Sequence, residues 1–342
     1  MKAIVCHAHG ALEALRWEDT DSPTLGSGQV RIDVHAAGVN FADTLKVHGT
    51  HQVKVALPWT PGAEIAGLVK EVAEGVSGLR VGDRVLGVPG NRAGGFAEEI
   101  VLGAERVLPL PASPPFEEAA ALPAAYGTAL YSLKQRAHLC AGDVILVLGA
   151  AGGVGQAAVQ IAAAMGARVI AGASTAEKRQ AALQHGAFHA VDYTRENWRT
   201  QILELTGPSG VDVVFDPVGG DVFDEAVRTV GWDGRYLVVG FAAGRIPALK
   251  LNHPLVKGYN LMGIRYDVWR DRFWPEARGN LEQVLRWHTE GKVRPLVSST
   301  NTVSNAVEAL LAIAGRKAMG KVVLIARSAN SEFKTETEGK PL

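Results

Sequence analysis

The sequence predicts an α/β protein of two domains, a β-barrel domain and a domain built on a doubly wound, six-stranded parallel sheet. Two observations support this prediction. The chain has 342 residues, more than the length of about 100–200 residues that is usual for one domain. Short apolar runs and turns dominate up to about Phe116, whereas strand and helix patterns alternate from about Pro123 to Gly263.

Residues 1–122 are expected to form the first part of the β domain. Val30–Val34 alternates like a half-buried strand, and Ile65–Val69 and Arg84–Val88 are short apolar runs. Turn-forming pairs such as Pro61-Gly62 separate these runs. The pattern is typical of a compact, barrel-like β structure.

Residues 123–265 are expected to form the second domain, because short apolar strands that alternate with helices indicate a parallel sheet covered on both faces. The predicted strands are 144–148, 168–172, 189–192, 212–216, 235–240 and 260–264. The predicted helices begin near Gly153, Thr175, Thr194 and Asp221. Residues 266–327 are expected to return to the first domain, and residues 328–342 lack apolar anchors and are expected to be disordered.

The most informative segment runs from Val144 to Gly155. A continuous apolar run opens into a glycine-rich turn, and small and apolar residues then recur at helical spacing. Strand, tight turn and helix in this order form the phosphate-binding half of a dinucleotide-binding unit. A pyrophosphate lies against backbone N–H groups at a helix N-terminus, where a Cβ would hold it off. The segment therefore predicts a bound dinucleotide cofactor.

The end of the second strand of this unit indicates which dinucleotide is bound. A carboxylate there would accept hydrogen bonds from the ribose 2′-OH and repel a 2′-phosphate. The segment Gly172–Arg179 has none at the strand tip, whereas Ser174 and Thr175 can donate hydrogen bonds and Lys178 can supply charge. The chemistry favours NADPH over NADH. The alternative is that Lys178 and Arg179 simply form a solvated helix face.

Composition argues against several other classes of function. Lys plus Arg and Asp plus Glu both total 35, so neither a nucleic acid nor a membrane is an expected partner. There is no apolar signal segment and no run of about 18 apolar residues. Two cysteines, Cys6 and Cys140, fit a reducing cytoplasm and are too few for a structural zinc site. We expect a metal-free, cytoplasmic enzyme.

Six segments together resemble the medium-chain dehydrogenase/reductase superfamily, and specifically its zinc-free quinone oxidoreductase (ζ-crystallin-like) branch. They are Ala37–Thr44, Leu57–Gly67, Val81–Val85, Ala150–Gly155, Val239–Gly244 and Gly320–Leu324. The resemblance spans about residues 1–327. It implies a GroES-like catalytic domain built from both ends of the chain, a Rossmann domain between them, and a homodimer joined through the edge strand near 258–264.

The resemblance also implies the residues of the site. Asn40 and Thr128 would lie near the nicotinamide, and Ala63 and Asn40 stand where zinc-containing relatives carry metal ligands. The full set implied for NADPH is Asn40, Thr128, Ala151, Gly152, Gly153, Val154, Ser174, Lys178, Tyr193, Gly240, Phe241, Ala242 and Arg316. Within it, residues 151–154 would hold the pyrophosphate, and Ser174, Lys178, Tyr193 and Arg316 would surround the 2′-phosphate.

The chain departs from its relatives where a substrate is expected to bind. Leu45 or Lys46, and His51, stand where relatives often carry a tyrosine. The candidates to position a carbonyl or a proton are Asn40, Asp43, His51 and Tyr126, although Asn40 and Asp43 also suit a turn and a helix cap.

The expected function is NADPH-dependent reduction of quinones or related conjugated carbonyls by hydride transfer. One alternative is an enoyl-thioester or alkenal/enone reductase, which would use the same hydride step. The other is a non-catalytic NADPH-binding protein, crystallin-like or RNA-binding.

Overall fold

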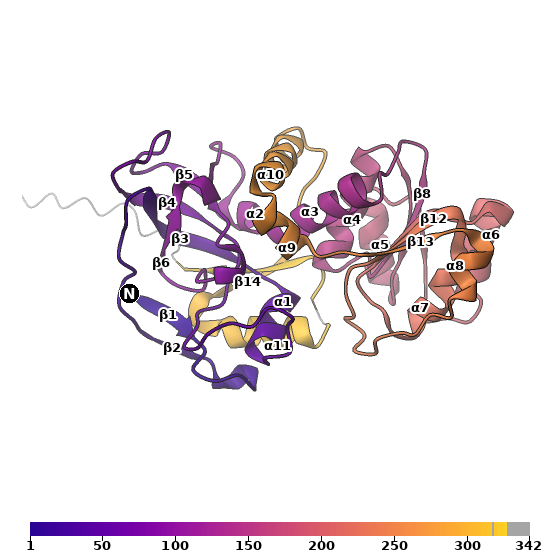
Figure 1. Ribbon diagram of the computed structural model, residues 1–342, viewed down its shortest axis with the longest axis horizontal. Coiled ribbons are helices and arrows are strands. Elements are labelled where there is room, and N and C mark those ends of the chain that lie inside the picture. The colour runs from indigo at the N-terminus through magenta and orange to yellow at the C-terminus, as the bar shows by residue number, and fades with distance from the viewer. Residues whose placement is uncertain (317, 327–342) are drawn as a thin grey trace, which may run out of the picture. The chain divides into compact units, whose positions relative to one another are not determined.

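The computed structural model describes residues 1–316 and 318–326 (Figure 1). They form two compact units. Unit 1 contains Met1–Ala120, Thr300–Ala314 and the described residues from Val323 onward. Unit 2 contains Ala121–Ser299 and Gly315–Val322. The expected tail, residues 328–342, lies outside the described residues.

Unit 1 is built on antiparallel strands, as expected for the GroES-like β domain. Its main sheet has the order β14-β15-β3-β4-β5-β7, and β6 also pairs with β3. The strands are β3 (Gln29–Val39), β4 (Ile65–Val72), β5 (Arg84–Gly87), β6 (Glu99–Gly103), β7 (Val107–Pro109), β14 (Val297–Thr302) and β15 (Lys321–Ile325). The first residues of β14 and β15, 297–299 and 321–322, are assigned to unit 2. A separate hairpin joins β1 (Lys2–Val5) and β2 (Arg16–Asp19), and the helices are α1 (Phe41–Val47), α2 (Phe116–Ala120) and α11 (Ala306–Ala314).

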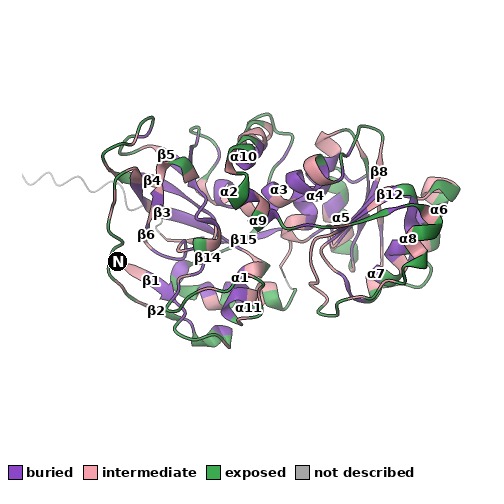
Figure 2. Ribbon diagram, viewed as in Figure 1, coloured by how far each residue is buried: buried purple, intermediate pink, exposed green. Residues whose placement is uncertain are grey.

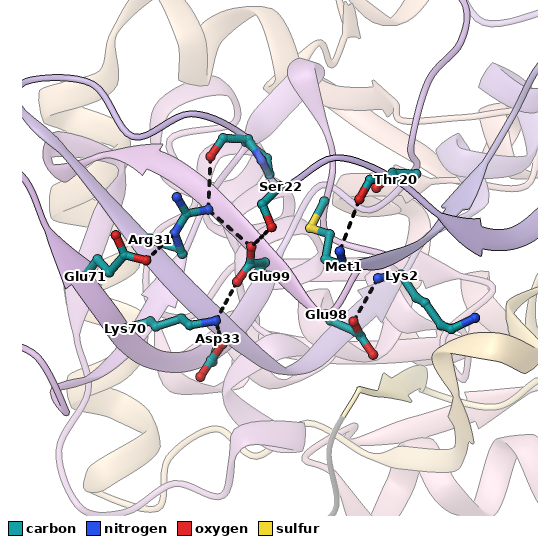
Figure 3. Close-up of polar contacts among 11 residues, drawn as sticks. Met1, Lys2, Thr20, Ser22, Arg31, Asp33, Lys70, Glu71, Glu98 and Glu99 are labelled. Atoms are coloured by element: carbon teal, nitrogen blue, oxygen red, sulfur yellow. Dashed lines mark hydrogen bonds and ion pairs between the residues drawn. The ribbon is translucent and has the colours of Figure 1, made fainter.

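A group of paired charges ties β3, β4 and β6 together (Figure 3). The Glu99 carboxylate accepts hydrogen bonds from Lys70 Nζ at 2.8 Å, from Arg31 Nη1 at 3.2 Å and from the Ser22 hydroxyl. Burial alone would raise the pKa of Glu99, but these hydrogen bonds and positive charges outweigh it and lower that pKa. A buried charge is costly unless it is paired, so the register of three strands is coupled to this one carboxylate.

Unit 2 contains the predicted six-stranded parallel sheet, in the order β10-β9-β8-β11-β12-β13. The strands are β8 (Val144–Leu148), β9 (Arg168–Gly172), β10 (His189–Val191), β11 (Val211–Asp216), β12 (Val230–Val238) and β13 (Asn260–Gly263). The helices between them are α4 (Gly153–Ala164), α5 (Ala176–Gln184), α6 (Trp198–Thr206), α7 (Gly220–Ala226) and α8 (Asn252–Lys257). All six predicted strands are confirmed, within a few residues at their ends.

Apolar side chains of this sheet alternate between two cores. Ile145 and Val147 of β8 belong to one buried cluster, and Leu146 and Leu148 belong to another. Successive side chains of a strand point to opposite faces, so both faces of the sheet are covered. Figure 2 shows β8 as buried.

Helix α6 begins at Trp198, four residues after the predicted start at Thr194. The reason is local. The N–H and hydroxyl of Thr194 both donate to Asp192 Oδ1, at 3.1 and 2.6 Å, which closes a turn instead of a first helical turn.

Residues 266–299 lie in unit 2, which differs from the prediction that residues 266–327 return to the first domain. They contain α9 (Tyr266–Arg272) and α10 (Trp274–Thr289). Helix α10 packs on α3 (Pro123–Leu130), with Val284 in the unit 2 core and Asn280 Oδ1 accepting a hydrogen bond from Gln135 at 3.0 Å. This packing depends on residues far apart in the sequence, which helical periodicity alone does not reveal.

Candidate functional site

The glycine-rich turn has the predicted order of strand, tight turn and helix. Gly149 follows β8 with a φ of 59°, a backbone conformation that favours glycine. The turn is closed by a hydrogen bond from Gly152 N to Gly149 O at 2.9 Å, and Gln156 N then donates to Gly152 O at 2.8 Å as α4 begins. The N–H groups of the first turn of α4 have no acceptor within the helix and point out of its N-terminal end. In this position they can donate hydrogen bonds to an anion.

Two glycines of this turn have different roles. A Cβ on Gly155 would lie 2.2 Å from Gly149 O, so the packing of helix on strand requires glycine there. A Cβ on Gly152 would meet only Gly149 O, at the ordinary contact distance of 3.4 Å, and its φ of −79° suits any residue. The described fold therefore does not require glycine at position 152.

A segment from the end of the chain lies against this turn. Gly320 N donates to Ala151 O at 2.7 Å, and Gly320 forms a parallel bridge with Gly152. Lys321 is 3% exposed, and a Cβ on Gly153 would lie 3.0 Å from Lys321 Cδ. Sequence reasoning missed Lys321 as a site residue, because nothing in its own segment shows that it returns to the turn.

Four residues predicted to bind a 2′-phosphate come together beyond the end of β9. Burial raises the pKa of Tyr193, against a hydrogen bond with Ser174 and the nearby charge of Arg316. Lys178 Nζ donates to Arg316 O at 3.4 Å. Arg179, by contrast, forms an ion pair with Asp192 at 2.8 Å, which accounts for its charge within the fold.

Asp216, at the end of β11, organises the neighbouring loop and is not among the residues predicted from sequence. Its carboxyl accepts hydrogen bonds from Tyr236 Oη at 2.7 Å, Val218 N at 2.8 Å and Gly219 N at 2.9 Å. Burial raises its pKa, against these three hydrogen bonds. Ala242 N donates to Pro217 O at 3.1 Å, so this loop also fixes the segment Gly240–Ala242.

The two predicted site residues of α3 have different surroundings. Tyr126 is fully buried in the unit 2 core, and its hydroxyl donates to Gln160 Oε1 at 3.2 Å. Burial and this contact give Tyr126 a place in the core, and its catalytic role stays a prediction. Thr128 is half-buried, and its carbonyl accepts a hydrogen bond from Ser132 Oγ at 2.6 Å.

In unit 1, Asn40 is held from two sides. Asp43 Oδ2 accepts a hydrogen bond from Asn40 N at 2.9 Å, which is one half of a capping box at the start of α1. Asn40 Nδ2 donates to Glu64 Oε1 at 2.8 Å, and Glu64 is fully buried. A Cβ on Gly38 would lie 2.2 Å from the same Glu64 oxygen, so Gly38 makes room for this carboxylate. Glu64 lies within a matched segment, but its contact with Asn40 was not predicted.

His51 lies shortly after α1 and is half-buried. Its Nδ1 accepts a hydrogen bond from Val53 N at 3.0 Å. A neutral ring with this partner carries its proton on Nε2. Of the four predicted catalytic residues, Asn40, Asp43 and His51 thus belong to the same part of unit 1.

Residues 1–316 and 318–326 contain no group of three or more His, Cys, Asp or Glu side chains that could hold a metal ion. Among the helices in that part of the chain, none combines the length and apolar character needed to cross a membrane.

Known proteins resemble the chain over nearly its whole length. Residues 26–112 match the alcohol dehydrogenase GroES-like domain, and residues 153–283 match the zinc-binding dehydrogenase family. The quinone oxidoreductase-like protein 2 homolog of Nematostella vectensis is 41% identical over 94% of this chain and 88% of its own length. The quinone oxidoreductase of Sus scrofa is 33% identical over 95% of this chain and 98% of its own length.

Solved structures are also similar to the chain over nearly its whole length. The mycobacterial protein Rv1454c, complexed with NADPH, has a TM-score of 0.87 and 30% identity, over 95% of this chain and 100% of its own. The two matched domains have the same order along the chain as the antiparallel and parallel sheets described above. The chain therefore belongs to the medium-chain dehydrogenase/reductase superfamily, in its quinone oxidoreductase branch, and is an oxidoreductase.

Proposed function

We propose that the chain is an NADPH-dependent reductase of quinones or related conjugated carbonyls, acting by hydride transfer and without zinc. The observation that carries this proposal is the turn at Gly152, where a Cβ would be tolerated by the fold but would occupy the approach to the start of α4. The similarity to a mycobacterial protein complexed with NADPH and to curated quinone oxidoreductases supports it.

The residues of unit 2 suit both phosphate groups of NADPH. Residues Ala151–Val154 would bind the pyrophosphate, with the N–H groups of Gly153 and Val154 at the positive end of the α4 dipole as donors, and Lys321 adds a positive charge at the same turn. Around the 2′-phosphate we propose Ser174, Lys178, Tyr193 and Arg316. All four side chains can donate hydrogen bonds and two are cationic, which suits the oxygens of a phosphate. Recognition of a free ribose 2′-hydroxyl would instead use a carboxylate as hydrogen-bond acceptor.

Bound NADPH supplies the hydride, and the protein orients the reactants and stabilises charge. We propose nicotinamide contacts for Asn40, Thr128 and Gly240–Ala242. The Glu64 carboxylate fixes the Asn40 amide in one orientation, and Asp43 fixes its backbone. His51 is the proposed donor to the oxyanion that develops on the carbonyl, because its Nδ1 is already an acceptor and its proton lies on Nε2.

Zinc independence is part of the proposal. Asn40 and Ala63 replace the residues that would ligate zinc in related enzymes, and Asn40 is instead engaged with Glu64. Cys6 and Cys140 belong to different units and are both free thiols, which also supports a reducing, cytoplasmic location.

An activity assay tests the proposed reaction directly. The purified protein, treated with a chelator, should oxidise NADPH with 1,4-naphthoquinone, and more slowly with crotonyl-thioester or a simple enal. Faster turnover of the thioester or enal would favour the alternative reductase. Activity that disappears with the chelator and returns with zinc would contradict the metal-free proposal. If no acceptor is reduced, the result would favour the alternative of a non-catalytic NADPH-binding protein.

Substitution of Lys178 tests the preference for NADPH. A charge-assisted hydrogen bond to phosphate contributes roughly 1.5–3 kcal/mol, or about one to two decades in affinity. Lys178→Ala should therefore weaken NADPH binding by about tenfold or more and leave NADH binding nearly unchanged, as measured by calorimetric titration at one ionic strength. Lys321→Met is the matched control, since loss of a pyrophosphate contact should weaken both cofactors alike. An equal loss of both cofactors in Lys178→Ala would show that Lys178 does not recognise the 2′-phosphate.

We further propose that the chain forms a homodimer through β13. This strand is at the end of the strand order, so one side of it presents backbone groups for pairing. Helix α8, which precedes β13 in the chain, is coloured mostly as exposed in Figure 2, and several large apolar side chains of residues 232–261 are exposed. The exposed residues are Trp232, Ile246, Leu251, Leu255, Val256 and Leu261. A two-fold axis would pair β13 with its copy and bury the same residues from both chains.

Leu255→Glu should disrupt this dimer, because two carboxylates would be buried in a symmetric apolar contact. Sedimentation equilibrium should give twice the chain mass for the wild type and a lower mass for the variant. Val81→Glu is the control, since Val81 is 67% exposed in unit 1 and lies outside the proposed interface. A monomeric wild type would contradict the proposal.

A further inference from the structure

Lys46 is an unusual residue for the middle of this fold. It lies on α1 and is only 4% exposed, although lysine is among the residues least often buried. Its Nζ is 3.2 Å from Asn91 Oδ1 and 6.0 Å from the centre of the Trp59 ring. An amide oxygen and the face of an indole are both surroundings that stabilise an ammonium ion.

The residues around Lys46 are fixed by backbone contacts between two loops. Trp59 Nε1 donates to Arg92 O at 3.2 Å, Gly94 N donates to Thr60 O at 2.9 Å, and Phe96 N donates to Pro61 O at 2.9 Å. The indole and the Asn91 loop therefore keep a fixed relation to each other.

The Asn91 loop also contains a strained residue. Ala93 has a φ of 58° and a ψ of −148°, a conformation that is essentially confined to glycine. Ala93 is buried, and the same short turn holds Asn91 in place beside Lys46. Backbone strain of this kind persists only where the surrounding structure enforces it, and it is concentrated at functional sites.

Lys46 shares helix α1 with the proposed catalytic residues. Asn40 caps the start of the helix, and Lys46 lies six residues later, about 9 Å along the helix axis. Asp43, between them, accepts the Asn40 N–H and so serves the start of the helix. One short helix therefore carries both residues, with their backbones separated by about the length of one small aromatic molecule.

We propose that Lys46, with Asn91 and Trp59, forms a subsite for an ionised oxygen of the substrate. The enzyme would then prefer conjugated carbonyl substrates that also carry a carboxylate or another anionic oxygen. Such a group would accept a charge-assisted hydrogen bond from Lys46 while its ring lies against Trp59. This inference rests on the proposed quinone reductase function and adds a substrate class to it.

The test compares 1,4-naphthoquinone with 1,4-naphthoquinone-2-carboxylate in wild type, Lys46→Met and Lys46→Arg. The ratio of kcat/KM for the carboxylate over that for the neutral quinone should fall by about tenfold or more in Lys46→Met. Lys46→Arg, which keeps the charge, should retain most of the ratio. An unchanged ratio in Lys46→Met, or an equal loss in Lys46→Arg, would overturn the subsite.

A binding measurement separates this inference from the proposed function. The dissociation constant of 1,4-naphthoquinone-2-carboxylate can be measured by fluorescence titration without turnover. If the wild type reduces neither quinone, the proposed function fails, but a dissociation constant about tenfold weaker in Lys46→Met would still support the anion subsite. Thermal unfolding of both variants shows whether the fold survives, and an equal dissociation constant in a folded Lys46→Met would overturn the subsite.

Discussion

The close approach of Gly155 to the carbonyl of Gly149 is the constraint on which the rest of unit 2 depends. Because a Cβ at Gly155 would lie 2.2 Å from that oxygen, helix α4 can begin immediately after β8 only with glycine there. This approach brings the first N–H groups of α4 to the end of the sheet, where ligands bind in parallel α/β folds. Two other parts of the chain then pack on the same turn, the Gly320–Lys321 segment and the loop held by Asp216.

Much of the parallel sheet could be predicted from sequence because its signals are local. A buried parallel strand is a continuous apolar run, and β8 and β9 have the predicted bounds for that reason. Predictions were poorer where a side chain competed with the backbone, as Asp192 does by capturing Thr194. They also differed from the structure where the packing of a helix determines the unit to which it belongs. Helix α10 is the example, because its Asn280 and Val284 pack within unit 2.

The candidate site divides in the same way. The glycine turn and the residues near Lys178 could be predicted because the residues of each group are close together in the sequence. Glu64, Asp216 and Lys321 could not, because each acts on a segment that is distant in sequence: Glu64 on Asn40, Asp216 on Tyr236 and Lys321 on the Gly153 turn. For Tyr126 the structure adds what its sequence segment does not reveal, namely full burial and a hydrogen bond to Gln160.

The central claim is that glycine at position 152 serves a ligand rather than the fold. Gly152→Val tests it, with Gly279→Val as the control, since a Cβ on Gly279 meets nothing within 4 Å. We expect Gly152→Val to unfold at nearly the wild-type temperature but to bind NADPH at least about tenfold more weakly in a calorimetric titration, because a lost charged hydrogen bond is worth roughly one decade or more. Gly279→Val should bind NADPH as the wild type does. Wild-type affinity in a folded Gly152→Val would contradict the account.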